Sequence, residues 1–198
     1  MRVYHREGTG RPLRIVWTLE EVGEPYELTV MSREEGKGPE HRERHPLGRV
    51  PVLQDERGYL FESAAICLHL ADQHPEAGLV PEVGSRERAL VYQWSCFAPA
   101  ELEPTLFEAW MQAERDPERA EKARRRFAAA AGAVARELDG DEHLVAGRFT
   151  VADVMVGTAL MFTTRAGIAD ELEPSLKDYV GRLAARPAFQ RAAKRALV

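Results

Sequence analysis

The stretch "GRVPVLQD" at residues 48–55, followed by "FESAAICLHLAD" at residues 61–72, decides the fold of this chain. Proline has no N–H and weakens a strand, yet Pro51 stands at the beginning of a short strand pattern. The second stretch passes through Glu62 and Ser63 straight into an apolar helical pattern. A helix N-terminus that carries a carboxylate and a hydroxyl attracts backbone amides or a charged ligand. We therefore expect a ligand site at this corner.

The sequence around this corner alternates between strand and helix patterns. Helices are predicted at 13–22 and 63–74, and the polar segment 32–45 is read as irregular, with a short helix or a lid. A strand–helix–strand start requires a right-handed crossover, so its two strands should be parallel. The last two strands form an antiparallel hairpin around "ERG". The strands are expected in the stretches "RVYH", "PYELTVM", "VPVLQD" and "GYLFE". The result is a small mixed sheet with helices on its faces.

The composition changes after a linker near residues 76–85, because no convincing strand pattern follows. Two domains are therefore predicted, at residues 1–76 and 86–198, the second entirely helical. Thr150 and Asp153 have the spacing of a capping box, and a structural role is the simplest reading of both. Helices are expected at 85–110, 117–140, 150–167 and 175–196.

Bulk composition narrows the classes of partner. The formal net charge is −5, which does not favour nucleic acid or an acidic membrane as a partner. Cys67 and Cys96 lie far apart in apolar helical patterns and read as core residues in a reducing compartment. The N-terminal stretch has no apolar signal segment and no run approaches a membrane span, so a cytoplasmic location is expected. His41 and His45 stand at i and i+4 without the other ligands of a zinc motif, so no metal is expected.

Two readings stay open for each half of the corner. Pro51 is either a trans proline that begins an edge strand or a cis proline that turns the chain and exposes the peptide groups of Val50. Ser63 is either a simple N-cap beside a solvated Glu62, or both side chains bind a ligand. A terminus with an ammonium and a carboxylate, as in an amino acid, suits the second reading.

These stretches resemble the cytosolic glutathione S-transferase family, bacterial type. The resemblance rests on "GRPLRIVWTLEEVGEPYEL", "HPLGRVPVLQDERGYLFESAAICLHLAD", "QWSCFAPAELEPTL" and "VAGRFTVADVMVG", in order along nearly the whole chain. It implies an α/β thioredoxin-like N-terminal domain that binds glutathione, followed by an all-α helical bundle. Glutathione is then the cosubstrate and no metal is needed.

The resemblance also implies roles for individual residues. Val50, preceding a cis Pro51, pairs through its backbone with the cysteinyl part of glutathione. Glu62 and Ser63 hold the amino and carboxylate groups of the γ-glutamyl part. Arg49 approaches the glycyl end, and His41 is a second candidate there.

The residue that activates the glutathione thiol is the weak point of the resemblance. Most members place a Tyr, Ser or Cys in the first loop, whereas this loop reads "EGTGRPLR". Thr9 carries the only hydroxyl of the loop and is the first candidate donor to the sulfur. Arg11 is the second, because a guanidinium favours a nearby anion. His5 is a third candidate, and Tyr4 lies within the predicted strand.

The family places its second substrate between the domains, where the apolar wall includes Phe97 in our prediction, with Trp94 and Trp110 as further candidates. Aromatic residues at this spacing on a helix also suit a core. Tyr92, Gln93 and Glu101 could face a second copy, since the family commonly forms homodimers around this helix.

The predicted function is transfer of the glutathione thiolate to a small hydrophobic electrophile, in detoxification. Glutathione-dependent peroxide reduction, dehalogenation and isomerisation use the same thiolate and stay open. A glutathione-binding protein with little transferase activity is the other alternative, because the usual thiol activator is missing. An interaction module is disfavoured by the intact Glu62–Ser63 pair.

Overall fold

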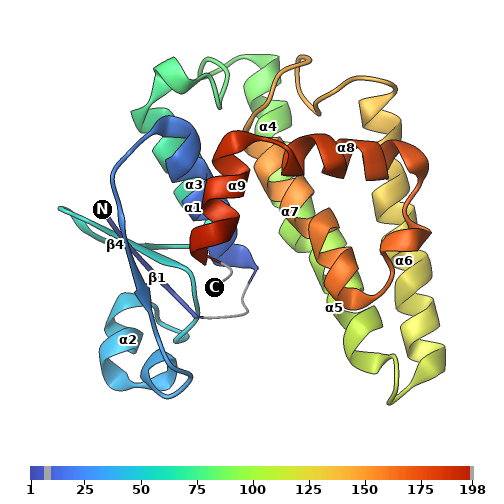
Figure 1. The fold of residues 1–198 in the computed structure, drawn as a ribbon, viewed down its shortest axis with the longest axis horizontal. Helices are drawn as coiled ribbons and strands as arrows, with labels where there is room; N and C mark the ends of the chain where they lie inside the picture. The colour runs from blue at the N-terminus through green and yellow to red at the C-terminus, as the bar shows by residue number, and fades with distance from the viewer. Residues whose placement is uncertain (7–9, 197–198) are drawn as a thin grey trace. The chain divides into compact units, whose positions relative to one another are not determined.

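The computed structural model describes residues 1–6 and 10–196, and their contacts divide the chain into two compact units (Figure 1). The first unit comprises Met1–Val80 together with Ala185–Val198, and the second comprises Pro81–Ala184. The last helix thus groups with the first unit, whereas the division made from the sequence placed it with the helical domain. The sequence-based boundaries at 1–76 and 86–198 remain a prediction.

The first unit is built on a four-stranded mixed sheet with the strand order β2-β1-β3-β4. β1 and β2 are parallel and β3 and β4 are antiparallel, as the sequence predicts. The structure adds that β3 also pairs antiparallel with β1. The strands are β1 (Arg2–His5), β2 (Glu27–Val30), β3 (Val52–Asp55) and β4 (Gly58–Phe61).

Helices of the first unit pack around α1, which contacts β1, α3 and α9. Helix α1 contains Pro12 in its first turn and ends at Gly23, whose φ of 73° suits a residue without a Cβ. The fully buried Trp17 of α1 meets Phe189 of α9 edge to face, with ring centroids 4.9 Å apart. The helical elements are α1 (Arg11–Val22), η1 (Glu35–Lys37), α2 (Pro39–Arg44), α3 (Ser63–Gln73), η2 (Pro75–Ala77) and α9 (Pro187–Ala196).

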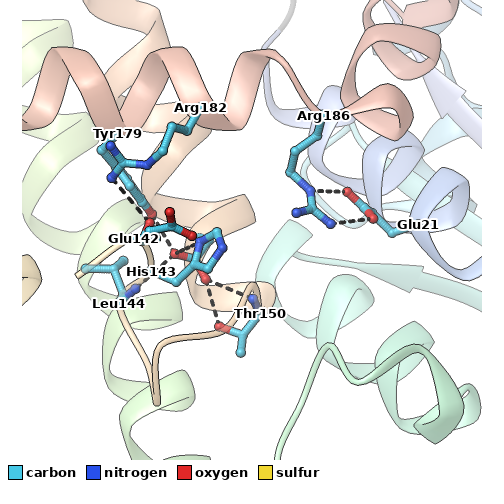
Figure 2. A network of polar contacts seen from close by, with 9 residues as sticks. Glu21, Glu142, His143, Leu144, Thr150, Tyr179, Arg182 and Arg186 are labelled. Atoms are coloured by element: carbon cyan, nitrogen blue, oxygen red, sulfur yellow. Dashed lines mark hydrogen bonds and ion pairs between the residues drawn. The ribbon is translucent and has the colours of Figure 1, made fainter.

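Polar contacts add to this packing of α9 on α1. The Arg186 guanidinium donates to both carboxylate oxygens of Glu21, at 2.7 and 2.9 Å (Figure 2). Arg191 donates to Glu20 on the neighbouring position of α1. Bidentate arginine–carboxylate pairs fix geometry as well as adding energy, so they set the position of α9 along α1.

The described residues of the second unit are mainly helical, with an isolated β-bridge between Val145 and Arg148 in the loop before α7, and α7 contacts α4, α5 and α8. The predicted helix 85–110 is interrupted by a π-helical turn that contains Pro99. The predicted helix 175–196 is two helices, because Pro187 lacks an N–H and disfavours helical backbone at the preceding residue. The elements are α4 (Arg86–Phe97), η3 (Ala98–Leu102), α5 (Glu103–Gln112), α6 (Pro117–Leu138), α7 (Val151–Ala166), η4 (Ala169–Glu171) and α8 (Pro174–Ala184).

A buried carboxylate organises the start of α7. Asp153 is fully buried and accepts hydrogen bonds from the Thr150 N–H, the Leu144 N–H and the Tyr179 hydroxyl, at 2.8 to 3.0 Å (Figure 2). The capping box predicted from the sequence is confirmed. Burial raises the pKa of Tyr179, and the neighbouring carboxylate raises it further, so the phenol remains a donor.

The two cysteines differ in their surroundings. Cys67 is buried, as predicted, and burial raises the pKa of its thiol to about 11. The prediction that Cys96 lies in the core is wrong, because this residue is exposed on α4. The buried positions of α4 are Arg88, Val91, Trp94 and Ser95, and Cys96 lies outside this buried face.

Candidate functional site

The register of the β3–β4 hairpin brings the two parts of the predicted corner to one end of the sheet. Val52 lies opposite Phe61, so the residues just before β3 and just after β4 are neighbours. The peptide bond between Val50 and Pro51 is cis. The paired register of β3 begins only at Val52, which leaves the Val50 peptide groups outside the strand ladder.

Glu62 and Ser63 form the turn from β4 into α3. Glu62 occupies the N-cap position with φ 71° and ψ 110°, a region that residues with a Cβ rarely adopt. Ser63 is the first residue of the helix, so of the two readings left open for it, that of a simple N-cap is wrong. The Ser63 side chain is buried, whereas Glu62 is exposed. Backbone strain of this kind persists where the surrounding structure enforces it, often at a binding site.

Arg14 is a component of the corner that the sequence reading missed. It is 2% exposed, and its Nη1 donates to Ser63 Oγ over 3.3 Å. It stands in the apolar run "LRIVW" on α1. A buried charge is rarely tolerated without partners, so an arginine inside an apolar helical face is a signal that could have pointed to it.

Arg49 and His41 meet through the backbone of the loop before Pro51. The Arg49 side chain is exposed, and its carbonyl oxygen lies 2.8 Å from Nε2 of His41. His41 is fully buried in α2. The buried His41 imidazole is therefore hydrogen-bonded to the backbone of its own chain.

His45 directly follows α2 and contacts the end of β4. Its ring packs on Phe61 with centroids 4.8 Å apart, and its Nδ1 accepts the Leu47 N–H at 3.1 Å. Burial lowers the pKa of His45, the Glu62 carboxylate acts in the opposite direction, and His41 and Arg49 lower the pKa further. The end of the hairpin therefore holds a neutral imidazole beside an exposed carboxylate.

The first loop carries the candidate thiol activators. Thr9 lies outside the described residues, so its role stays a prediction. Arg11 is the first residue of α1 and is half-buried. His5 is fully buried at the end of β1. Tyr4 is buried in the sheet and donates its hydroxyl hydrogen to Gln54 Oε1 at 2.7 Å, in agreement with its reading as a strand residue.

The aromatic candidates of the helical unit have different environments. Phe97 is half-buried and packs edge to face on the buried Trp94, with centroids 5.1 Å apart. Trp110 is 41% exposed and packs against Phe162. Tyr92 is exposed to the same extent on α4. Phe97 and Trp110 are thus both partly exposed.

The described residues contain neither a metal-binding cluster nor a membrane-spanning helix. Within residues 1–6 and 10–196, no cluster of three or more His, Cys, Asp or Glu side chains could hold a metal ion. No helix in the same ranges is both long and apolar enough to cross a membrane.

The first unit has a four-stranded mixed sheet flanked by helices, and its cis proline lies opposite the Glu-Ser turn. A helical unit follows in the chain. These features together are those of the class of thioredoxin-like transferases. The family comparison agrees with this class. The model described as "Glutathione S-transferase, N-terminal domain" matches residues 1–72, and that described as "Glutathione S-transferase, C-terminal domain" matches residues 71–187. The chain belongs to the glutathione S-transferase family.

Individual relatives span nearly the same length. A probable glutathione S-transferase of Oryza sativa subsp. japonica is 29% identical, over 98% of this chain and 95% of its own. Glutathione S-transferase GST-4.5 of Xanthomonas campestris is 32% identical, over 73% of this chain and 74% of its own. The solved structure of a sphingomonad glutathione S-transferase complexed with glutathione is 29% identical, with a TM-score of 0.85 and 98% of each chain covered.

Proposed function

We propose that the corner made by Val50, Pro51, Glu62 and Ser63 is the glutathione clamp of a transferase. The hairpin register carries this proposal, because pairing of Val52 with Phe61 puts the cis peptide and the Glu-Ser turn at the same end. The Val50 peptide groups lie outside the strand ladder and suit the extended cysteinyl part of the tripeptide. A related sphingomonad enzyme has been solved with glutathione.

The two ends of glutathione call for different groups. The Ser63 hydroxyl and the N–H groups that begin α3 suit the γ-glutamyl carboxylate, since helix N-termini favour anions. The exposed Glu62 carboxylate suits the ammonium group of the same part. The exposed Arg49 guanidinium suits the glycyl carboxylate as a charge-assisted partner.

The reaction is conjugation of the glutathione sulfur to a small hydrophobic electrophile. The thiol loses its proton to solvent, and the thiolate sulfur then forms a bond to an electrophilic carbon. The leaving group departs with the electron pair of the broken bond. A free thiol has a pKa of about 8.5, so the protein must favour the anion to work at neutral pH. Thr9 and Arg11 are the proposed groups for this task.

The same proposal extends to the second substrate, the cellular location and the oligomeric state. Phe97 contributes to the apolar surface that receives the electrophile. The protein acts in the cytoplasm, in detoxification, as a homodimer. The exposed Tyr92 and Gln93 on α4 are candidate contacts to the second copy. Sedimentation of the wild type gives the oligomeric state directly.

The test is the ultraviolet absorbance of the thiolate of bound glutathione, titrated with pH. We expect the bound thiol of the wild type to ionise well below about 8.5. A rise of this pKa in Thr9→Ala assigns the donor to Thr9, and a rise only in Arg11→Gln assigns it to Arg11. Chlorodinitrobenzene serves as the electrophile for turnover.

Two results would contradict the proposal. Glutathione that binds with an unshifted thiol indicates a binding protein without transferase chemistry. Unchanged glutathione affinity in Ser63→Ala and in Glu62→Gln indicates that the clamp lies elsewhere.

A further inference from the structure

A histidine of the η1–α2 segment is hydrogen-bonded to the loop that precedes the cis Pro51. His41 is fully buried in α2, and its Nε2 lies 2.8 Å from the carbonyl oxygen of Arg49. A carbonyl can only accept, so Nε2 carries the hydrogen and donates it. The other ring nitrogen, Nδ1, is buried without a hydrogen-bond partner among the described residues. The hydrogen bond that this imidazole makes among the described residues is therefore the one to the Arg49 carbonyl.

A second contact fixes the same stretch of backbone from the same segment. Gly48 has φ 59°, and a Cβ built on it would lie 2.8 Å from the carbonyl oxygen of Gly36 in η1. No side chain fits in that space, so the backbones of the two segments approach as closely as glycine allows. The chain that leads into the clamp is therefore held at residues 48 and 49 in succession.

Peptide planarity carries this constraint forward by one atom group. The Arg49 carbonyl and the Val50 N–H belong to one peptide unit, and the six atoms of that unit lie close to a plane. A hydrogen bond that fixes the direction of the carbonyl also fixes the direction of the N–H on the opposite side. A hydrogen bond accepted by the carbonyl further polarises the unit and makes its N–H a stronger donor.

We infer that His41 is a positioning residue of the glutathione clamp, acting through the Arg49–Val50 peptide. This inference rests on the proposed function, in which the Val50 backbone binds the cysteinyl part of glutathione. His41 touches neither glutathione nor the electrophile. It sets the angle at which the Val50 N–H meets the tripeptide.

The test compares three substitutions by calorimetric titration with glutathione. Gln places an amide N–H near the position of Nε2, whereas Leu fills the space without a donor. We expect His41→Leu to raise the Kd for glutathione about tenfold or more, and His41→Gln to stay within about threefold of the wild type. His69→Leu, a half-buried histidine on α3, is the matched control and should leave the Kd unchanged.

Steady-state kinetics with chlorodinitrobenzene supply the second readout. Loss of a residue that positions glutathione should raise the KM for glutathione, while kcat at saturation falls much less. If His41→Leu does not fold, His41→Asn replaces it, because its shorter amide also fails to reach the carbonyl. Circular dichroism melting of each variant separates loss of fold from loss of affinity.

The possible results separate the two claims. A wild type that does not bind glutathione overturns the proposed function, and the inference with it. A wild type that binds, with His41→Leu or His41→Asn binding equally well, overturns the inference alone. A folded His41→Gln that binds as poorly as the Leu variant also overturns it, since the donor then contributes nothing beyond packing.

Discussion

Arg14 and Ser63 are joined by a buried hydrogen bond of 3.3 Å between residues 49 positions apart in the chain. A guanidinium can only donate, so Ser63 Oγ is the acceptor. The hydroxyl hydrogen of Ser63 is then directed to a different partner. In the proposed clamp, that partner is the anion at the start of α3.

A double-mutant cycle tests this relationship. Arg14→Met should lower the free energy of unfolding by about 1–3 kcal/mol, since a buried acceptor loses its donor. Both Arg14→Met and Ser63→Ala should raise the Kd for glutathione, and the double variant should raise it by less than the product of the two effects. Arg2→Gln, which removes an exposed ion pair with Glu27, is the control. Strictly multiplicative effects would show that the two residues act independently.

The strained backbone at Glu62 predicts a trade of stability against affinity. Glu62→Gly relieves a φ of 71°, a conformation that costs about 1–3 kcal/mol in residues with a Cβ. Part of this gain is offset by the flexibility of glycine in the unfolded chain. We expect an equal or higher melting temperature together with weaker glutathione binding.

Glu62→Gln is the matched variant, because it removes the charge and keeps the Cβ. Its melting temperature should stay at the wild-type value while its glutathione affinity falls. A Gly variant that melts well below the Gln variant would contradict the assignment of strain.

The Asp153 cluster predicts a graded loss of stability. Asp153→Ala leaves four buried donors without their acceptor and should cost about 3 kcal/mol or more, the donors being the Leu144 N–H, the Thr150 N–H, the Thr150 hydroxyl and the Tyr179 hydroxyl. Tyr179→Phe removes one of these donors with little change of shape and should cost about 1 kcal/mol. Urea denaturation followed by circular dichroism measures both. Equal losses in the two variants would mean that the carboxylate matters only through Tyr179.

The lowered pKa of His45 predicts a pH dependence with a definite sign. Its folded pKa lies below the unfolded value of about 6.5, so the unfolded chain takes up the proton first as pH falls. Stability contributed by the neutral ring is present above about pH 6.5 and is lost as pH drops through the unfolded pKa toward the folded one. Protonation also removes Nδ1 as the acceptor of the Leu47 N–H.

Chemical denaturation at a series of pH values from 8 to 5 (about the range over which a histidine titrates) checks this sign. In His45→Asn the side-chain oxygen can still accept the Leu47 N–H, so the variant should lose less stability on acidification than the wild type. Glu62→Gln should lose more, because Glu62 favours the protonated ring. A His45→Asn curve parallel to the wild type would rule out His45 as the titrating group.

Sequence reasoning predicts the fold of this protein well, because its local signals are consistent with one another. Pro12 and Gly23 bound α1, and "ERG" closes a hairpin whose register then follows from alternation. The capping box at Thr150 is likewise a local pattern. Breaks within long helical patterns were missed at Pro99 and Pro187, where favourable flanking residues hid the effect of the proline.

The site was less predictable from the sequence, because the residues that support the Glu-Ser turn and the cis proline reach them only through tertiary contacts. Glu62 and Ser63 stand out in the sequence, but nothing local shows that Glu62 takes the strained position and Ser63 the first helical one. Arg14 meets Ser63 only after α1 and α3 pack together. The proposed role of His41 depends on the loop before Pro51, whose backbone at Gly48 can lie close to the Gly36 carbonyl because Gly48 has no side chain.

The return of α9 to the first unit has a consequence for biosynthesis. During synthesis, the chain from β1 to α3 leaves the ribosome well before α9 (Pro187–Ala196) is made. Trp17 of the first unit is therefore covered by Phe189 only after α9 has been synthesised. A shortened gene that ends at Val80 would leave that indole and the carboxylates of Glu20 and Glu21 facing water. Such a truncated product should aggregate, and adding a synthetic peptide of residues 185–198 in trans should rescue it.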